Sequence, residues 1–591
     1  MEAKSLGVKG VFQNDILMVI PYYQRRYVWN EEKDQNWSRF ADDMESTMET
    51  DSSYFLGSLI LKEVKRNEAD MANGVTKKRV VVDGQQRLTT MAIYMKILHQ
   101  LTGHDGEYMS YYQLGNDRKD PILKHNCEDC GDFNDIILGE IPQERVGDSL
   151  IIGANNFFYN RFMKLVEEGI NLNALRQAIY SHVNFVVIEI TEQEDEQQIF
   201  DTINSLGVDL TTDELLKNYL YEEKDEEIYK QTWKVMFDSD TSKKFWGTDA
   251  ASAKQAKKDT VLDRFLHAFV LMKMWDFKLS AIHKKEFVKS ENVYKACKAF
   301  HETYDMSKLD LANEIIRYAK IYRENLDDSV LDERIPKYSG IKRLACLING
   351  NKSYVVLPYM LYILGNVKDN NERNKVFGYL ETYLVRRLLC KSSSNSYTDL
   401  FSENLINKGV KTYNELRKYI EEKDQSSNLA MPTDDDLKLS IGQVNLDERS
   451  IRTIFYLYET KLRSAQDEGG LTYGINKYSV ERMMPRPSAE ANKNWPQAPD
   501  IQQENERKKI IQTFGNGFML EDVDETALRK VRNKSFSEKR NVCKQYIGNV
   551  QSSNILKNKH SWDTESITSR NDTFAEIFSE KVWKLNDDGS K

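Results

Sequence analysis

The feature that most constrains the fold of this chain is residues 80–90, VVVDGQQRLTT, where a strand meets a helix at a glycine. Three consecutive valines predict a buried strand, because β-branched residues are favoured there. Asp83 and Gly84 predict a tight turn. Residues 88–101 follow with apolar side chains every three or four positions, which predicts a helix. Strand, turn and helix therefore meet at Gly84.

The turn at Gly84 carries groups that suit the phosphates of a nucleotide and their metal ion. The start of a helix presents free backbone N–H groups and the positive end of the helix dipole. The same turn adds the Asp83 carboxylate, two side-chain amides and the Arg87 guanidinium. A capped turn, whose polar side chains satisfy the loop backbone, explains the spacing equally well. Spacing alone does not decide between the two interpretations.

Length and composition indicate a multidomain globular protein. At roughly 150 residues per domain, 591 residues predict three or four units. With 40% hydrophobic and 30% charged residues the chain is not disordered, and a net charge of -9 still permits a local basic surface. Residues 1–10 lack the apolar core of a signal peptide, and the longest apolar run, residues 354–364, is too short to span a bilayer. Six sparse cysteines fit free thiols in a reducing compartment, so we expect a cytoplasmic protein without a membrane partner.

Three further motifs accompany residues 80–90: residues 20–29 (IPYYQRRYVW), residues 54–61 (YFLGSLIL) and residues 199–220 (IFDTINSLGVDLTTDELLKNYL). In this order the four motifs resemble the signatures of the GmrS-type domain of GmrSD-family, modification-dependent (type IV) restriction proteins. The resemblance implies a ParB/sulfiredoxin-like fold associated with nucleotide hydrolysis. It also implies a nucleoside triphosphate of unassigned base as cofactor, together with Mg²⁺.

The resemblance assigns residues of the four motifs to the nucleotide site. The family more often carries an arginine where Leu206 stands, a departure that removes one phosphate contact from the fourth motif. That motif also fits a helix–loop–helix joint in which an asparagine and a glycine supply turn geometry. The expected catalytic residues are Asp83, Gln86 and Arg87, and the expected nucleotide-binding residues are Gln24, Arg25, Gly84, Gln85, Asn204, Gly207 and Lys217.

Residues 125–130, HNCEDC, offer three ligands of the kind that zinc prefers. A structural zinc site usually needs a second pair of ligands, and none follows at a usual spacing. We therefore assign no metal to this segment.

Two composition changes divide the chain. From residue 229 to about 440 apolar residues recur at helical spacing, which predicts an all-α connector. Residues 423–436 form a polar linker rich in Ser and Asp. The predicted fold is therefore an α+β multidomain one, with a nucleotide-binding domain over residues 1–228, the connector over 229–440 and a further domain over 441–591.

The last domain resembles the GmrD-type HNH nuclease domain that accompanies GmrS-type domains, which implies a ββα-metal centre within helices. The corresponding residues here are Glu481, Arg482, Asn516 and Asn533. The family pattern at the first box is Glu-His-Ile-x-Pro, so Arg482 stands in the place of the histidine. An asparagine is usual five residues before Asn533, where this chain has Leu528.

Arg482 makes DNA cleavage by this chain doubtful. An HNH centre needs a histidine to activate water, and arginine is never deprotonated in a protein. Residues 440–559 contain no histidine. A permanent cation still binds phosphate, and residues 501–560 hold 12 Lys and Arg against 7 Asp and Glu. We expect a DNA-binding surface that includes Arg529, Lys530 and Arg532, with a merely solvated charged face as the alternative.

Together these features predict a component of bacterial anti-phage defence. The chain would bind and hydrolyse a nucleoside triphosphate and sense modified phage DNA, while a partner subunit with an intact HNH box cuts. Two alternatives stay open: a complete single-chain, modification-dependent endonuclease or nickase, and a ParB-like, nucleotide-gated DNA clamp that cuts nothing. A homo-oligomer also stays open.

Overall fold

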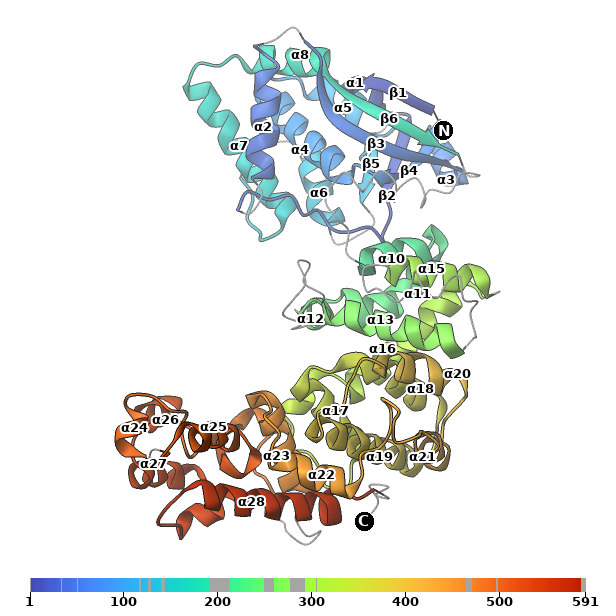
Figure 1. Ribbon diagram of the computed structural model, residues 1–591. Helices are drawn as coiled ribbons and strands as arrows, with labels where there is room; N and C mark the ends of the chain where they lie inside the picture. Colours follow the sequence, from blue (N-terminus) through green and yellow to red (C-terminus); the bar gives the residue numbers. More distant parts are fainter. Residues whose placement is uncertain are drawn as a thin grey trace. The chain divides into compact units, whose positions relative to one another are not determined.

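The computed structural model divides the chain into two compact units (Figure 1), which we call the N-terminal unit, Met1–Gln231, and the C-terminal unit, Thr232–Lys591. The structure describes residues 2–32, 35–49, 52–115, 118–125, 129–139, 144–191, 212–248, 260–276, 293–304, 306–462, 470–495 and 498–585.

The N-terminal unit is built on a six-stranded mixed sheet with the strand order β1-β6-β3-β4-β2-β5. The pairs β1–β6 and β3–β4 are antiparallel, and the pairs β3–β6, β2–β4 and β2–β5 are parallel. The strands are β1 (Glu2–Gly7), β2 (Ile16–Ile20), β3 (Tyr54–Val64), β4 (Lys77–Asp83), β5 (Leu123–His125) and β6 (Val183–Ile190). The strand predicted before Asp83 is thus β4, an inner strand, and the motif at residues 54–61 forms most of β3.

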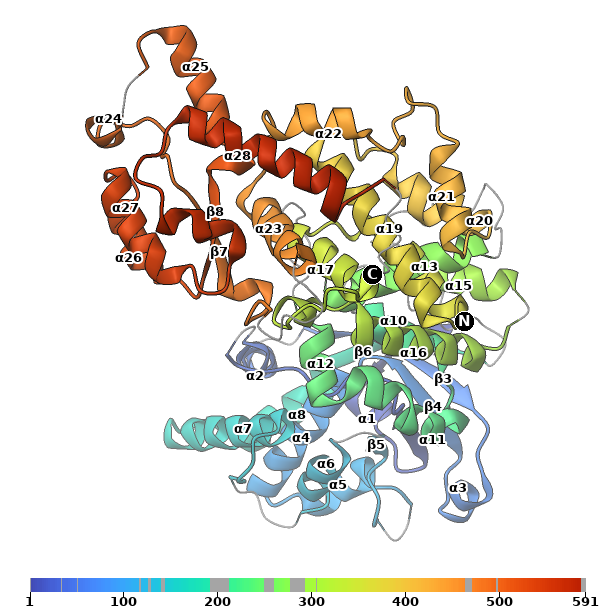
Figure 2. The same ribbon diagram turned by 90° about the horizontal axis from the view of Figure 1, so that it is seen from below.

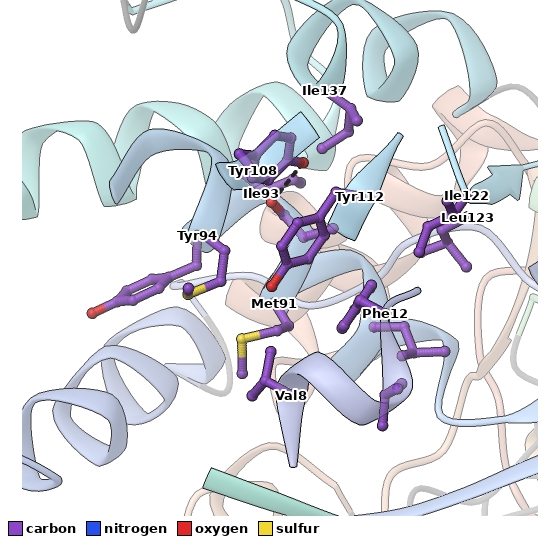
Figure 3. Packing of buried hydrophobic residues seen from close by; sticks show 14 of the residues in the cluster. Val8, Phe12, Met91, Ile93, Tyr94, Tyr108, Tyr112, Ile122, Leu123 and Ile137 are labelled. Carbon is purple, nitrogen blue, oxygen red and sulfur yellow. Dashed lines mark hydrogen bonds between the residues drawn. The ribbon is translucent and has the colours of Figure 1, made fainter. Parts of the chain in front are cut away.

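The helix predicted over residues 88–101 is α4 (Gln85–Leu101), which begins three residues earlier, directly after Gly84. It is buried on nearly every side, so its sequence shows a weaker amphipathic pattern than a surface helix. Figure 3 shows its residues Met91, Ile93 and Tyr94 in the core beside the stacked rings of Tyr108 and Tyr112, whose centroids are 4.4 Å apart. This packing fixes the start of α4 relative to the sheet.

Other helices of the N-terminal unit surround α4 or cover the sheet. Those that pack against α4 are α5 (Asp105–Tyr112), α6 (Cys130–Ile137), α7 (Leu150–Glu167) and α8 (Leu172–His182). The others described are α1 (Val8–Val11), α2 (Asn36–Ser46), α3 (Glu68–Ala72), α10 (Thr212–Leu220) and α11 (Glu226–Gln231). The mixed α+β fold is confirmed, and the relation of the sheet to a ParB/sulfiredoxin fold stays a prediction.

The first part of the C-terminal unit is helical, as the apolar spacing predicts: between residues 232 and 477 the described residues form helices and no strand. Its longer helices are α12 (Asp240–Trp246), α13 (Val261–Asp276), α15 (Val293–Thr303), α16 (Lys308–Asn325), α17 (Gly340–Asn351), α18 (Leu357–Asn366), α19 (Asn370–Leu389), α21 (Tyr413–Glu421), α22 (Asp434–Ile441) and α23 (Glu448–Leu462).

The last part, residues 441–591, which we call the HNH-like region, contains a two-stranded antiparallel sheet of β7 (Tyr478–Arg482) and β8 (Gly517–Glu521). Figure 2 shows these strands beside two helices, α26 (Glu525–Val531) and α27 (Phe536–Cys543). The other described α-helices of this region are α23, given above, α24 (Ala491–Asn494), α25 (Ile501–Ile510) and α28 (Thr564–Ile577). The helices α24 and α25 lie between the two strands in the chain, and the ββα-metal arrangement expected here stays a prediction.

The boundary predicted at residue 440 lies inside the C-terminal unit. The buried carboxylate of Glu381 on α19 accepts hydrogen bonds from Arg343 on α17, at 2.6 and 2.8 Å, and from the Trp583 indole, at 2.9 Å. Arg343 also donates to Thr460 Oγ1 on α23 at 2.6 Å. Connector and HNH-like region therefore share buried polar contacts. No helix within the described ranges is long and apolar enough to cross a membrane.

Candidate functional site

Gly84 alone connects β4 to α4. Its φ of 99° lies in the left-handed region, which favours glycine. An added Cβ would stand 2.3 Å from Leu59 Cδ2, so the site also excludes any side chain sterically. No described side chain caps α4. The backbone N–H groups of its first turn, which have no intrahelical partner, are therefore available at the end of β4.

Three glutamines of the predicted nucleotide site bind the backbone around this turn. Each donates its side-chain amide to a main-chain carbonyl: Gln24 to Val81 at 2.6 Å, Gln85 to Arg25 at 2.6 Å and Gln86 to Arg26 at 3.2 Å. Gln86 Oε1 also accepts from the N–H of Val28 at 2.8 Å. These amides hold residues 24–28 against the start of α4, which is the loop-capping role that the sequence left open.

The charged side chains of the turn, Asp83 and Arg87, bind each other instead of the backbone. Arg87 Nη2 donates to Asp83 Oδ2 at 3.1 Å, and both side chains are about one-quarter exposed. The guanidinium passes over Gly57, whose φ of 128° and lack of Cβ leave room for it, since an added Cβ would stand 2.1 Å from Nη1. Gln85 Oε1 is buried without a hydrogen-bond partner in the described structure. A carboxylate, a guanidinium and an unpaired acceptor thus meet at one helix start.

The fourth motif reaches the same place through α10. In the amide orientation that satisfies both of its side-chain atoms, Asn218 donates to the carbonyl of Tyr23 at 3.0 Å, and Leu215 packs against the small apolar cluster that includes Val82. Lys217 is buried on this helix. Asn204 and Gly207 lie outside the described residues. The structure therefore brings the first, third and fourth motifs together, and their assignment to a nucleotide stays a prediction.

Of the segment at residues 125–130, the structure describes His125, Asp129 and Cys130. Burial lowers the pKa of His125 to about 3, and its Nε2 lies 3.1 Å from Thr89 Oγ1. Cys127 is outside the described residues, and Cys130 is a free thiol. Among described residues no group of three His, Cys, Asp or Glu is arranged to hold a metal ion.

A second candidate site is a cavity of about 520 Å³ in the HNH-like region. Its lining comes from β7, the segment after it, and helices α23, α26 and α27. Charged and polar lining residues are Glu448, Ser479, Glu481, Arg482, Arg486, Ser488, Glu525, Arg532, Asn533 and Lys539. The structure thus brings Glu481, Arg482 and Asn533, which are up to 52 positions apart in the sequence, to the wall of one cavity.

Arg482 is the last residue of β7, and its guanidinium contacts two backbone carbonyls. Its Nη2 lies 3.2 Å from the Leu446 carbonyl and 3.5 Å from the Gln512 carbonyl, and its Nε has no partner among described residues. Burial lowers the pKa of Arg482, and nearby Arg486 lowers it further. The group nevertheless remains a cation, because guanidinium is not deprotonated in proteins.

Glu481, the residue before it, is paired with a lysine. Lys539 Nζ lies 2.5 Å from Glu481 Oε1 and also donates to the carbonyls of Arg482 at 2.6 Å and Arg532 at 3.2 Å. The side chain of Lys539 is fully buried. The spacing of residues in the sequence does not predict the contact between Lys539 and Glu481. It does indicate that Lys539 is buried, because Lys539 lies on the same face of α27 as the apolar residues Phe536 and Cys543.

The side chain of Asn516 is buried and holds a loop through hydrogen bonds to the backbone. Its Nδ2 donates to the carbonyls of Met484 and Ile511, at 2.8 and 2.7 Å, and its Oδ1 accepts from the Met484 N–H at 2.8 Å. The Trp562 indole donates to the same oxygen at 3.1 Å. Arg570 on α28 fixes the adjoining turn through the carbonyls of Gly515 and Gly517. Asn516 therefore holds the loop behind the cavity and does not face it.

The remaining predicted residues divide between cavity and surface. Leu528 is buried in the apolar cluster of the HNH-like region, which accounts for an apolar residue at that position. Asn533 donates to Glu490 at 3.3 Å. Of the three cations proposed for DNA binding, Arg532 lines the cavity, whereas Arg529 and Lys530 are exposed on α26.

Comparison with protein families gives a match for each end of the chain. The N-terminal domain of the GmrSD restriction endonuclease matches residues 8–221, and the C-terminal domain of GmrSD restriction endonucleases matches residues 431–577. The chain belongs to the GmrSD restriction endonuclease family. Both candidate sites of this GmrSD protein lie within the matched regions, and residues 222–430 lie between them. A search of curated proteins found no match.

Membership of the GmrSD family confirms the resemblance seen in the motifs and identifies a restriction protein with a role in defence against phage. The first match ends at residue 221 and the second begins at residue 431, and the domain limits at residues 228 and 440 stay predictions. The roles of individual residues in both sites stay predictions.

Proposed function

We propose that this GmrSD protein is a nucleotide-dependent DNA sensor whose HNH-like region holds DNA without cutting it. The N-terminal unit binds and hydrolyses a nucleoside triphosphate with Mg²⁺ at the Gly84 turn. The target is DNA, in keeping with the restriction endonuclease family, and specifically modified phage DNA. A partner subunit with an intact HNH box performs the cut.

The observation that carries the proposal is the cavity beside Arg482. No histidine is among the described residues that line it, and His560, the nearest in sequence, is exposed elsewhere on the surface. Hydrolysis of a phosphodiester needs a base to activate water, and a guanidinium cannot accept the proton. The Glu481 carboxylate is paired with Lys539. The cavity therefore has the cations to hold a phosphate, and its described lining has no histidine to activate water.

The Gly84 turn supports the nucleotide half of the proposal. Free N–H groups at the start of α4 suit phosphate oxygens, and Asp83 suits Mg²⁺ because that ion prefers carboxylate oxygen. Arg87 adds a charge-assisted contact to a phosphate. The unpaired Gln85 Oε1 is an acceptor for a hydroxyl or amino group of the nucleoside. These groups meet within five consecutive residues.

Steady-state hydrolysis of nucleoside triphosphates by the full chain tests this half. Asp83→Ala removes the metal contact and Arg87→Ala a phosphate contact, so each should lower turnover about tenfold or more, since charge-assisted hydrogen bonds are worth roughly 1.5–3 kcal/mol. Asp120→Ala and Lys124→Ala are matched controls, because they form an exposed i, i+4 pair in the same unit. Unchanged turnover in both turn variants would refute the placement. Nucleotide binding without turnover in the wild type would instead favour a DNA clamp.

Nicking of supercoiled DNA, modified and unmodified, tests the other half. The full chain with nucleotide and either Mg²⁺ or Mn²⁺ should leave the DNA intact. General-base catalysis contributes roughly 10²–10⁴-fold, so the assay must resolve residual activity over that range. Metal-dependent nicking by the wild type that Glu481→Gln abolishes would show a working nuclease site. The complete single-chain endonuclease would then be the correct interpretation.

A further inference from the structure

The ammonium group of Lys539, in the wall of the cavity of the HNH-like region, has an acceptor for each of its donors. The group has three N–H donors, and three oxygens lie within 3.2 Å: Glu481 Oε1 and the carbonyls of Arg482 and Arg532. The residue is 0% exposed. A buried charge is tolerated when it is paired and hydrogen-bonded, and this one is both. The contacts join β7, the end of α26 and α27 at one point.

The three oxygens around this ammonium are of the kind that hold a divalent cation. Mg²⁺ and Ca²⁺ bind carboxylate and backbone carbonyl oxygens, and here one carboxylate and two carbonyls point at a single position. That position lies in the wall of the cavity, beside the residue at the end of β7. A tethered monovalent cation therefore takes the ligands that a metal ion would use.

The pairing of Lys539 with Glu481 also affects which partners remain for Arg482. Because Glu481 is paired with Lys539, the guanidinium of Arg482 is left with two long contacts to backbone carbonyls and an unpartnered Nε among the described residues. Arg486 and Arg532 line the same cavity, and the acidic residues Glu448 and Glu525 line it as well. With Lys539 and Glu481 included, four cations face three carboxylates. The cavity thus keeps a positive charge without any bound metal.

We propose that Lys539 is a built-in substitute for the divalent cation, so that this cavity binds a phosphate group of DNA without metal. Arg482 contacts the phosphate, because a guanidinium matches its oxygens in a bidentate geometry. Arg486 and Arg532 add positive charge at the rim. The inference rests on the proposed function, since it assumes that the HNH-like region holds DNA rather than cutting it.

Binding of a short DNA duplex to the full chain tests the phosphate contact. Affinity in excess EDTA should equal that in Mg²⁺ within about twofold. Arg482→Gln should lower it about tenfold or more in both buffers, as expected for loss of a charge-assisted bond to phosphate. Lys477→Gln, in an exposed ion pair with Asp522 away from the cavity lining, is the matched control and should lower affinity by less than about threefold. A requirement for Mg²⁺ in the wild type, or equal effects of the two variants, would overturn the inference.

Lys539→Met tests the cation itself. The variant leaves three oxygens and an uncompensated carboxylate, so Mn²⁺ should raise its unfolding temperature and restore its DNA affinity, with no such effect on the wild type. The double variant Lys539→Met with Glu481→Gln should lose the response to Mn²⁺. If Lys539→Met does not fold, hydrogen exchange of the wild type decides: added Mn²⁺ should not change protection over residues 478–543, and a change there overturns the inference.

These measurements separate the two proposals. An absence of nucleotide turnover in the wild type would refute the proposed nucleotide-dependent sensor but would not affect the inference of metal-free DNA binding. A Mn²⁺ response at residues 478–543 would defeat the role of Lys539 while leaving the nucleotide site untouched.

Discussion

At the scale of single residues, both candidate sites depend on side chains that bind backbone carbonyls far away in sequence. The side-chain amides of Gln24, Gln85 and Gln86 donate to such carbonyls, and so does the ammonium group of Lys539. Gln24, Gln85 and Gln86 could be singled out from the sequence because they belong to the motifs that carry the family resemblance. Lys539 could not be, because no local rule connects α27 to a carboxylate 58 positions earlier. The same limit applies to Asn516, whose structural role depends on a loop that spacing does not describe.

Gly84 offers a prediction at this scale. Gly84→Ala should destabilise the N-terminal unit by roughly 2 kcal/mol or more, because alanine is strained in the left-handed region and its Cβ would overlap Leu59. Gly131→Ala on α6 is the control: nothing lies within 4 Å of an added Cβ there, so its effect should stay below about 1 kcal/mol. Chemical unfolding gives the magnitude, and hydrogen exchange across α4 assigns it to this unit. Equal effects of the two substitutions would show that the turn is not constrained.

At the scale of elements, the spacing of apolar residues and the turn residues predicted whether a segment is a helix or a strand better than they predicted where it begins. β4 lies where three consecutive valines indicated a strand, and α4 lies where the helical spacing indicated a helix. The start of α4 was placed three residues late, since Gln85, Gln86 and Arg87 carry no apolar periodicity although they already belong to the helix. The order of strands in the sheet could not be derived, because it depends on pairings between segments more than 100 residues apart, such as β1 with β6.

At the scale of the whole molecule, the composition changes gave two divisions and the structure has one. The linker at residues 423–436 is polar, yet helices on both sides of it pack into one unit. Arg386 on α19 donates to the carbonyls of Pro432 and Trp583, at 3.0 and 2.9 Å, and to Asp434 Oδ1 at 2.8 Å. A buried arginine with such partners cannot be recognised from composition. Residues 423–436 therefore lie within the C-terminal unit, with Ala430 and Met431 buried, and a domain boundary there stays a prediction.

The pair between Glu381 and Arg343 tests that unity. Both side chains are almost fully buried, and removal of one partner leaves an uncompensated charge, so Glu381→Ala should destabilise the C-terminal unit by roughly 3–5 kcal/mol. Glu421→Ala removes the partner of Arg417 in an exposed i, i+4 pair and should cost less than about 1 kcal/mol.

Hydrogen exchange of the Glu381→Ala variant distinguishes one unit from two. Because the carboxylate also accepts from the Trp583 indole, its loss should weaken residues 564–583 and β7 together with α17 and α19. Denaturant-dependent exchange should then show these segments opening at a common midpoint, lowered in the variant and unchanged in Glu421→Ala. Retained protection of β7 and β8 alongside exposed α19 would mean that the HNH-like region is stable by itself. The linker at residues 423–436 would then mark a true domain boundary.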